Sequence, residues 1–367
     1  MLAKRIESIN RKIIYFIISL FFRNKPRSTP LNPDSIKRVL IFRYDAIGDM
    51  IVTMPAVDVL GQILPDATID VLASNRNYSI ISNDTRFNNY FVYNGSFHSF
   101  FKIIFKLRSQ KYDAVFAFVL HKTTKAGILA NLIAGKKAAK VSIRHNKRAE
   151  LYSTFFNVQL DVEEYRNRMT MAELQARMVC DCFGKNFDDY SLNYQIYIKE
   201  KHRIAARKIL GNFSNKKLIA INISSGHHAR FSKFIELIAS ISEKNNEYEF
   251  AIISVPSDYP LACTIAEKSY GKVTALNPSN DILEVCSLFE HFYAIITPDT
   301  SIVHIASAFK VPMIVMYVKS DSHVNEWMPF GVDFRCIITD GKKDLDSIEV
   351  QPVADAFDDL MKSIEKS

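Results

Sequence analysis

The chain has 367 residues, of which 48% are hydrophobic and 23% are charged. That balance excludes a disordered or fibrous protein, and the length is sufficient for two domains with separate cores. The formal net charge is +8 at pH 7. A positive balance of this size indicates an anionic partner, whether a nucleic acid, a membrane surface or a phosphorylated substrate.

The N-terminal segment, residues 1–34, is expected to be a basic amphipathic helix followed by a linker. Residues 13–22 are almost all apolar and are flanked by Lys and Arg on both sides. The run is too short to span a bilayer, and the basic residues after it do not form a signal-peptide cleavage site. Two interpretations remain open. The helix lies in the plane of the cytoplasmic membrane face, where anionic lipids attract basic residues, or it packs on protein.

The rest of the chain alternates between apolar strands and amphipathic helices in two series. In the first series we expect strands at residues 38–43, 68–73, 90–93, 114–120 and 139–143, then a long helix at 163–183 and a strand at 194–198. In the second series we expect strands at residues 218–223, 250–255, 273–276, 294–297 and 313–317, separated by helices.

Such alternation predicts an α/β protein in which mostly parallel sheets are covered by helices on both faces. We therefore expect two Rossmann-like, doubly wound domains facing a central cleft. Their predicted bounds are 35–195 and 196–350. Residues 351–367 are predicted to form a last helix that returns toward the first domain.

Neither a metal nor a cofactor is expected. The five cysteines, at 180, 182, 263, 286 and 336, include no Cys-x-x-Cys pair and are interpreted as reduced thiols of a cytoplasmic protein. The side chains of the adjacent His227 and His228 diverge, and no third metal ligand is evident.

The first strand ends in a turn that holds Gly48 and Asp49, and a helix follows. The pattern is neither a Gly-x-Gly-x-x-Gly fingerprint nor a Walker loop. Ligands of open α/β sheets bind beyond the carboxyl ends of the strands, which is where Asp49 is expected. Two roles are open for this residue. It is either a general base toward an acceptor hydroxyl or an acid stabilised by the helix dipole.

A second polar turn, at residues 298–302, lies between an apolar strand and an apolar helix. Helix N-termini present N–H groups and a partial positive charge to phosphates. The backbone of Ser301 and Ile302 and the hydroxyl of Thr300 are therefore candidate diphosphate donors, with Asp299 beside them and His304 one turn further on. The alternative is a capped helix that contains a buried, hydrogen-bonded histidine.

A third polar segment, residues 222–231, follows the first strand of the second series. Ser224, Ser225 and Gly226 can donate hydrogen bonds to a phosphate, and Arg230 can pair with one through two hydrogen bonds.

Residues 114–149 form a one-sided basic stretch with eight Lys and Arg and no Asp or Glu. It is either a solvated face or a surface for an anionic substrate or a membrane. Nucleic acid is not expected, because the aromatic residues of the stretch, Phe116 and Phe118, lie in the strand and do not alternate with the basic residues.

Two of these motifs together resemble glycosyltransferase family 9, the family of ADP-heptose:lipopolysaccharide heptosyltransferases. They are the Gly48-Asp49 turn with the following Thr53-Met54-Pro55-Ala56, and the segment 297–308. The resemblance covers roughly residues 36–318. It implies a GT-B architecture, with the acceptor bound mainly by the first domain and the nucleotide-sugar by the second.

The resemblance also implies roles for particular residues. The family's catalytic aspartate corresponds to Asp49, and its donor-binding turn corresponds to Asp299, Thr300, Ser301 and Ile302, with His304 at the matching histidine. Where many members have Lys-Arg-Trp, this chain has Ala229-Arg230-Phe231. Because the lysine is absent, Arg230 or Lys233 must neutralise the diphosphate. A histidine that opens the long helix near Glu163 in many members is absent too.

The resulting hypothesis is an inverting transfer of a sugar, expected to be a heptose, from an ADP-type donor to a lipopolysaccharide or lipooligosaccharide core. Asp49 is the expected base. Lys122, Lys125 and Arg144 are candidate contacts to this anionic glycolipid, and the N-terminal helix would hold the enzyme at the inner face of the cell membrane. Two alternatives remain: a GT-B enzyme with another nucleotide-sugar for a different surface glycan, or a non-catalytic binding protein with this fold.

Overall fold

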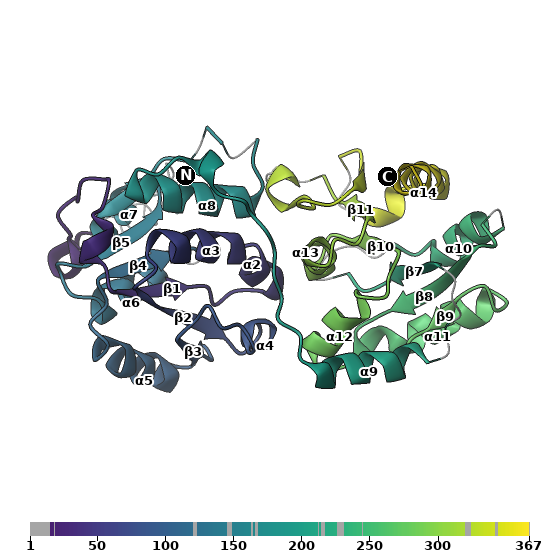
Figure 1. Ribbon diagram of the computed structural model, residues 1–367, viewed down its shortest axis with the longest axis horizontal. Helices are drawn as coiled ribbons and strands as arrows, with labels where there is room; N and C mark the ends of the chain where they lie inside the picture. Colours follow the sequence, from purple (N-terminus) through teal and green to yellow (C-terminus); the bar gives the residue numbers. More distant parts are fainter. Residues whose placement is uncertain are drawn as a thin grey trace, which may run out of the picture. The chain divides into compact units, whose positions relative to one another are not determined.

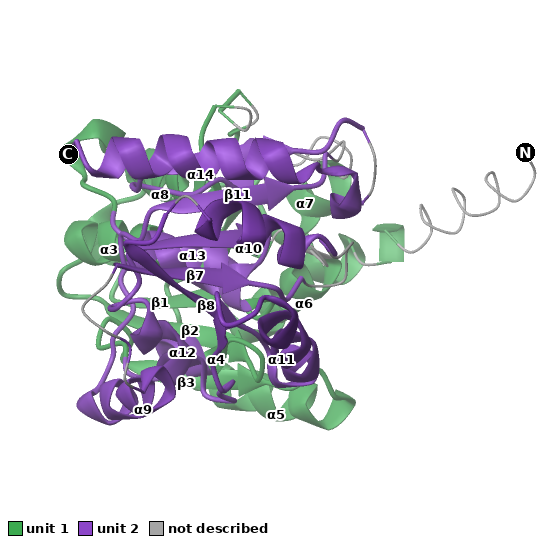
Figure 2. Ribbon diagram, turned by 90° about the vertical axis from the view of Figure 1, so that its right-hand side faces the viewer, with its two compact units in different colours: residues 1–46, 53–78, 84–192 green, residues 47–52, 79–83, 193–367 purple. Residues whose placement is uncertain are grey.

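A computed structural model (Figure 1) describes most of the chain. The described residues are 15–17, 19–119, 123–144, 149–162, 164–165, 168–211, 213, 217–225, 231–243, 245–319, 324–341 and 344–366. They form two compact units, which Figure 2 shows in green and purple. Unit 1 comprises residues 1–46, 53–78 and 84–192, and unit 2 comprises residues 47–52, 79–83 and 193–367.

Unit 1 contains a six-stranded parallel sheet in the order β3-β2-β1-β4-β5-β6. The strands are β1 (Arg38–Phe42), β2 (Thr68–Ser74), β3 (Asn89–Tyr93), β4 (Ala114–Ala117), β5 (Ala139–Ile143) and β6 (Val158–Leu160). The helices are α3 (Met54–Ile63), α4 (Tyr78–Ile81), α5 (Phe97–Arg108), α6 (Thr123–Ile133), α7 (Ala149–Phe155) and α8 (Met171–Phe183). β6 is not predicted from the sequence, because three residues give little pattern.

Helices cover both faces of this sheet. α3 packs on α8 on one face (Figure 1). On the other face α5, α6 and α7 pack in series. Because side chains alternate along a strand, Leu40 and Phe42 both point into the core beneath α5, α6 and α7. The predicted helix at 163–183 is shorter than expected. It begins at Met171, because Thr170 and Glu173 form a capping box that fixes its start.

Unit 2 repeats this arrangement with the order β12-β11-β10-β7-β8-β9, again all parallel. The strands are β7 (Lys217–Asn222), β8 (Tyr248–Ile253), β9 (Thr274–Ala275), β10 (Ala294–Pro298), β11 (Met313–Tyr317) and β12 (Phe334–Ile338). The helices are α2 (Ile47–Ile51), α9 (Glu200–Leu210), α10 (Phe234–Ser242), α11 (Tyr259–Lys268), α12 (Ile282–Leu288), α13 (Ser301–Ala308) and α14 (Val350–Ile364). The α/β class with two doubly wound sheets is therefore confirmed.

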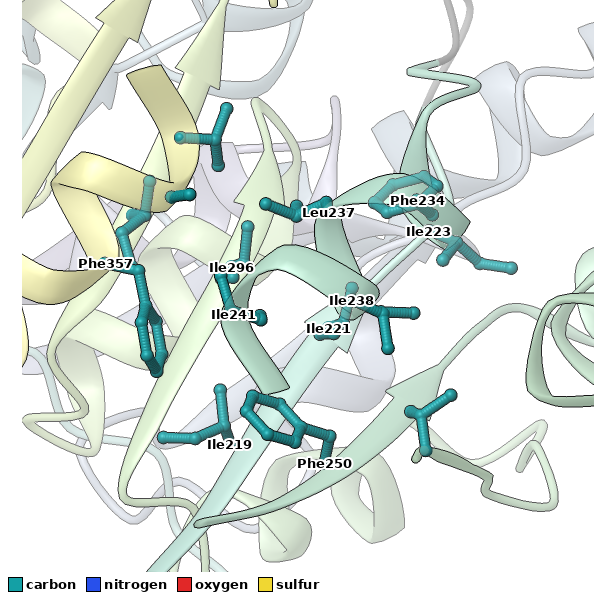
Figure 3. Close-up of a cluster of buried hydrophobic side chains, with 14 of the residues drawn as sticks. Ile219, Ile221, Ile223, Phe234, Leu237, Ile238, Ile241, Phe250, Ile296 and Phe357 are labelled. Atoms are coloured by element: carbon teal, nitrogen blue, oxygen red, sulfur yellow. The ribbon is translucent and has the colours of Figure 1, made fainter. Parts of the chain in front are cut away.

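One expectation for this part of the chain is wrong, since residues 194–198 do not form a strand. The last predicted helix is present as α14, which packs on α10, β11 and β12 within unit 2. Phe357 and Leu360 on its apolar face are fully buried in the core of that unit. Figure 3 shows Phe357 in this core with Ile296 and Phe250.

The five cysteines, all within the described residues, are free thiols. Among the helices that the structure describes, none is both long and apolar enough to cross a bilayer.

Candidate active site

The turn between β10 and α13 presents a helix N-terminus at the carboxyl edge of the sheet in unit 2. Thr300 is the N-cap residue, and its Oγ1 accepts a hydrogen bond from the N–H of Ile302 at 3.2 Å. The sequence predicts that the Ile302 N–H donates to a phosphate, but here the cap engages this group. The N–H of Ser301, at the first helical position, has no acceptor inside the helix by geometry and is suited to an anion.

A buried asparagine at the end of β7 connects this turn to the neighbouring polar loop. Nδ2 of Asn222 donates to Oγ1 of Thr297 at 3.0 Å and to Oγ1 of Thr300 at 3.4 Å. Oδ1 of Asn222 accepts from the N–H of Ser224 at 3.1 Å. The asparagine therefore fixes the carboxyl ends of β7 and β10. No role is predicted for it from the sequence, because only the pairing of these two strands places Asn222 beside Thr297.

The two candidate serines of the loop after β7 have different surroundings. Ser224 is buried, and its Oγ accepts a hydrogen bond from the N–H of Val255 at 3.0 Å. Ser225 has a buried Oγ for which the described part of the chain offers no hydrogen-bond partner. Since an unsatisfied buried hydroxyl is costly, Ser225 is the better candidate for contact with a bound ligand.

The short helix α2, which carries Asp49, packs on α13 within unit 2. At Gly48 an added Cβ would lie 2.9 Å from Cδ2 of His304 and 3.5 Å from Cα of Ser301. Such distances leave no room for a side chain at position 48. The structure therefore packs the helix that carries the half-buried Asp49 on the first turn of α13.

His304 lies beneath this contact and not on an open surface. It is 3% exposed, and its ring packs near those of Tyr194 and Trp327, with centroid distances of 6.3 and 6.0 Å. The sequence leaves open a donor contact or a buried histidine. The burial favours the second role, in which His304 supports the helix that carries Asp49.

Asp299 is exposed at the end of β10, and its N–H donates to the carbonyl of Met316 in β11 at 3.0 Å. Burial and the nearby Asp299 carboxylate raise the pKa of Tyr317 well above its usual value. The Tyr317 hydroxyl therefore stays protonated and donates to the carbonyl of Trp327 at 2.7 Å. A carboxylate repels phosphate, so Asp299 is better suited to accept from a hydroxyl group of a ligand than to contact a diphosphate directly.

Sequence reasoning missed a further hydroxyl at the same edge of the sheet. Ser254 follows β8, and its Oγ is buried without a hydrogen-bond partner in the described part of the chain. It lines a small cavity together with Leu276, Asn277 and Pro278, which follow β9. The strand predicted at residues 250–255 includes Ser254, so the sequence alone did not mark this residue as lying beyond the end of β8.

Several predicted site residues fall outside the described residues. They are Arg230, with Gly226, His227, His228 and Ala229 of the same loop, and Lys122. Lys233, the alternative to Arg230, donates to the carbonyl of Ile348 at 3.1 Å and pairs with Glu349 at 3.1 Å. Among the residues with described positions, no three His, Cys, Asp or Glu side chains are grouped to hold a metal ion.

The basic stretch belongs to unit 1 and does not form a uniform surface. Lys140 is buried, and its Nζ donates to Oδ1 of Asn24 and to the carbonyl of Gly135. Lys125 lies over the ring of Tyr93, 4.3 Å from its centroid. Arg144 is exposed and lies 3.7 Å from a carboxylate oxygen of Asp161. The expectation of a single solvated or ligand-facing surface is thus wrong for Lys140.

Comparison with known proteins defines the class. The structure of a glycosyltransferase family 9 protein from Veillonella parvula superimposes with a TM-score of 0.75 at 17% identity, over 92% of this chain and all of that one. The ADP-heptose lps heptosyltransferase II of Escherichia coli gives a TM-score of 0.69 at 19% identity, over 90% of this chain and all of that one. The fold is therefore the GT-B type of these glycosyltransferases.

The sequence comparisons identify the family. Residues 100–348 match the model of glycosyltransferase family 9 (heptosyltransferase). Lipopolysaccharide heptosyltransferase 3 of Escherichia coli is 25% identical over 357 residues, which cover 86% of this chain and 97% of that protein. The chain belongs to glycosyltransferase family 9 and is a glycosyltransferase.

Proposed function

We propose that this enzyme transfers a heptose from a nucleoside diphosphate donor, ADP-heptose, to a hydroxyl of a lipopolysaccharide or lipooligosaccharide core. The observation that supports the proposal is the packing of α2, the helix that includes Asp49, on α13 in unit 2, where Gly48 lies against Ser301 and His304. The names of two relatives support the choice of sugar and acceptor.

In the proposed reaction, Asp49 accepts the proton of the acceptor hydroxyl as the oxygen attacks the anomeric carbon. The bond to the diphosphate breaks on the opposite side, so the configuration inverts and no covalent intermediate forms. Negative charge grows on the departing diphosphate. The Ser301 N–H, the Ser225 hydroxyl and Arg230 would stabilise that charge, and donors fixed before the reaction lower the barrier most.

The other groups of the site hold the rest of the donor. Asp299, whose charge disfavours phosphate, would accept hydrogen bonds from hydroxyl groups of the sugar. Lys125 and Arg144 remain candidates for the anionic acceptor, and the N-terminal segment remains a candidate anchor on the inner membrane face.

The test is turnover of the Asp49→Asn enzyme, followed by release of ADP from ADP-heptose in the presence of a heptose-deficient lipopolysaccharide. We expect a loss of about 10²-fold to 10⁴-fold, because a general base contributes that much. ADP should still protect the variant against thermal unfolding. The matched control is Asp66→Asn, an exposed aspartate of unit 1. Undiminished turnover of Asp49→Asn would remove Asp49 from the catalytic role.

The choice of nucleotide needs its own measurement. ADP should raise the unfolding temperature more than UDP, GDP or CMP at equal concentration, since a ligand that binds only the native state stabilises it. A larger shift with UDP or GDP would favour the alternative of a different nucleotide-sugar. Thermal protection by none of the four would favour a non-catalytic protein with this fold.

A further inference from the structure

Helix α5 of unit 1 exposes three phenylalanines along one side. Phe97, Phe101 and Phe105 are 80%, 45% and 75% exposed. Their spacing of four residues places them in one stripe, because residues four apart lie on the same side of a helix. The opposite side of α5 is already used, since Ile103, Ile104 and Leu107 are buried in the core. The stripe is therefore an additional apolar surface that folding does not need.

Neighbouring rings in the first turns of α5 are in contact with each other. The centroids of Phe97 and Phe101 are 4.8 Å apart in an edge-to-face arrangement, and those of Phe100 and Phe101 are 5.6 Å apart. Three large rings in one exposed stripe are costly in water, and exposed apolar surface of this kind marks a site of interaction.

The charge around the stripe indicates what covers it. Between Asp84 and Asp113 the chain has no acidic residue, while α5 itself carries Lys102, Lys106 and Arg108. Phenylalanine on one side of a helix and Lys or Arg beside it is the composition of helices that lie in a membrane interface. An anionic membrane surface attracts the cations while its acyl region takes up the rings.

A basic cavity of about 710 Å³ adjoins the end of α5. Five cations line it, from the segment before β1, from the end of α5 and from the end of α6: Arg27, Arg108, Lys111, Lys136 and Lys137. The cavity also contains Asp113, whose Oδ2 already accepts from the N–H groups of Lys37 and Arg38. The net charge of the lining is thus suited to a phosphate group.

The same unit carries a second group of exposed apolar residues, before the Arg27 of the cavity lining. Phe16, Leu20 and Phe21 are 64%, 67% and 73% exposed. The residues that follow them are fixed to α6 and α7, because Asn24 donates to Asn131 at 2.8 Å and to the carbonyl of Thr154 at 3.0 Å. The cavity is lined both by the end of α5 and by Arg27, which belongs to the segment after the exposed N-terminal residues. Both helices that line it, α5 and α6, belong to unit 1 (Figure 2).

We propose that α5 is a membrane-docking helix, in which Phe97, Phe101 and Phe105 insert into an anionic bilayer while the basic cavity takes a lipid headgroup phosphate. This gives unit 1 a second point of attachment in addition to its N-terminal segment. Stable attachment generally needs two such signals. The inference does not depend on which sugar the enzyme transfers.

The first experiment measures binding of the full chain to vesicles of equimolar phosphatidylcholine and phosphatidylglycerol by co-sedimentation. The triple variant F97S/F101S/F105S should bind about tenfold or more weakly. Serine lacks the favourable free energy that each phenylalanine ring gains on moving from water into the apolar region of the bilayer. The matched control is I204S/V255S/L261S, which removes three exposed apolar residues of unit 2 and should bind as the wild type does. Equal binding of both triple variants and the wild type would overturn the proposal.

A second experiment separates insertion from contact with protein. The Phe105→Trp protein should show a blue-shifted tryptophan emission with these vesicles, and brominated acyl chains should quench it. The sequence has a single native tryptophan, Trp327, whose signal is subtracted with the wild type. An emission spectrum of Phe105→Trp that stays unchanged on vesicles that bind the protein would overturn the proposal. So would a lipid-free dimer that the triple Ser variant disperses, since the stripe would then be an interface between two copies.

A charge-reversal pair tests the cavity. K136E/K137E should weaken binding to the anionic vesicles about tenfold and leave binding to pure phosphatidylcholine unchanged, because each basic residue near the surface adds electrostatic attraction. K201E/K208E changes the net charge equally at exposed lysines of α9 and serves as the control. If both pairs weakened vesicle binding equally, the effect would come from the net charge of the protein and not from the cavity. That result would overturn the part of the proposal that concerns the cavity. If F16S/F21S lost binding while F97S/F101S/F105S kept it, attachment would depend on the N-terminal segment without α5, and the proposal would be overturned.

Discussion

Gly48 and His304 are so close that any side chain at position 48 would meet the imidazole ring. An added Cβ would lie 2.9 Å from Cδ2 of His304, and its other nearest neighbour is the backbone of Ser301 at 3.5 Å. This contact sets the distance between α2 and the first turn of α13. Because Asp49 is the next residue after Gly48, the contact also positions the proposed base.

We expect Gly48→Ala to reduce turnover at least about tenfold and to destabilise the fold by about 1–3 kcal/mol, because overpacking displaces the surrounding structure. His304→Ala should cost stability as well, since it leaves a cavity beside Tyr194 and Trp327. The double variant should be more active than Gly48→Ala alone. The measurement is a double-mutant cycle in turnover and in urea midpoint. Strictly additive effects would mean that the two residues do not interact.

Asn222 is predicted to be necessary for binding of the donor. Asn222→Ala removes the hydrogen bonds to Thr297 and Thr300 and leaves buried polar groups unsatisfied, which costs about 2–4 kcal/mol of stability. We also expect at least about tenfold weaker binding of ADP by isothermal titration, because Thr300 loses its support. Asn245→Ala removes one hydrogen bond to the carbonyl of Ile241 and is the control. Unaltered ADP affinity in Asn222→Ala would contradict the prediction.

Two helical glycines of unit 1 should respond oppositely to alanine. A Cβ at Gly127 in α6 would lie 2.3 Å from the ring of Phe155 in α7, whereas one at Gly61 in α3 would meet nothing within 4 Å. We expect Gly127→Ala to destabilise the protein by about 3 kcal/mol and Gly61→Ala to stabilise it by up to about 1 kcal/mol. Urea unfolding followed by circular dichroism measures both. A stabilised Gly127→Ala protein would show that α6 and α7 are not packed this closely.

Lys140 should make stability depend on alkaline pH. Burial lowers the pKa of Lys140 to about 8 from its ordinary value of 10.5. Between these values the unfolded chain binds the proton and the folded chain does not, so the free energy of unfolding rises with pH by up to about 3 kcal/mol. Below pH 8 this contribution is absent. Lys140→Met should lose the rise between about pH 8 and about pH 10, while the exposed Lys208→Met should keep it. Identical pH dependence in both variants would show that Lys140 is not the group responsible.

Much of the fold was predictable because the signal is local. Strands such as β7 and β10 are continuous apolar runs bounded by turn residues, and a parallel sheet buried on both faces requires that pattern. The helix starting at Ser301 was predictable from Thr300, a good N-cap. Other features are not local. The strong apolar stripe of α14 predicts a buried face, but a stripe does not specify which surface it will cover.

The sequence by itself determined the class of the protein and the positions of Asp49 and of the candidate phosphate-binding turn, since residue type and spacing specify those features along the chain. The tertiary structure decided which side chains and backbone groups are exposed or unpaired and can therefore contact a ligand. It buried Lys140 and His304, engaged the Ile302 N–H in the cap of its own helix, and placed Asn222 between two strands. It also left the Phe97, Phe101 and Phe105 stripe exposed. Burial and pairing depend on residues far apart in the chain, so no local pattern records them.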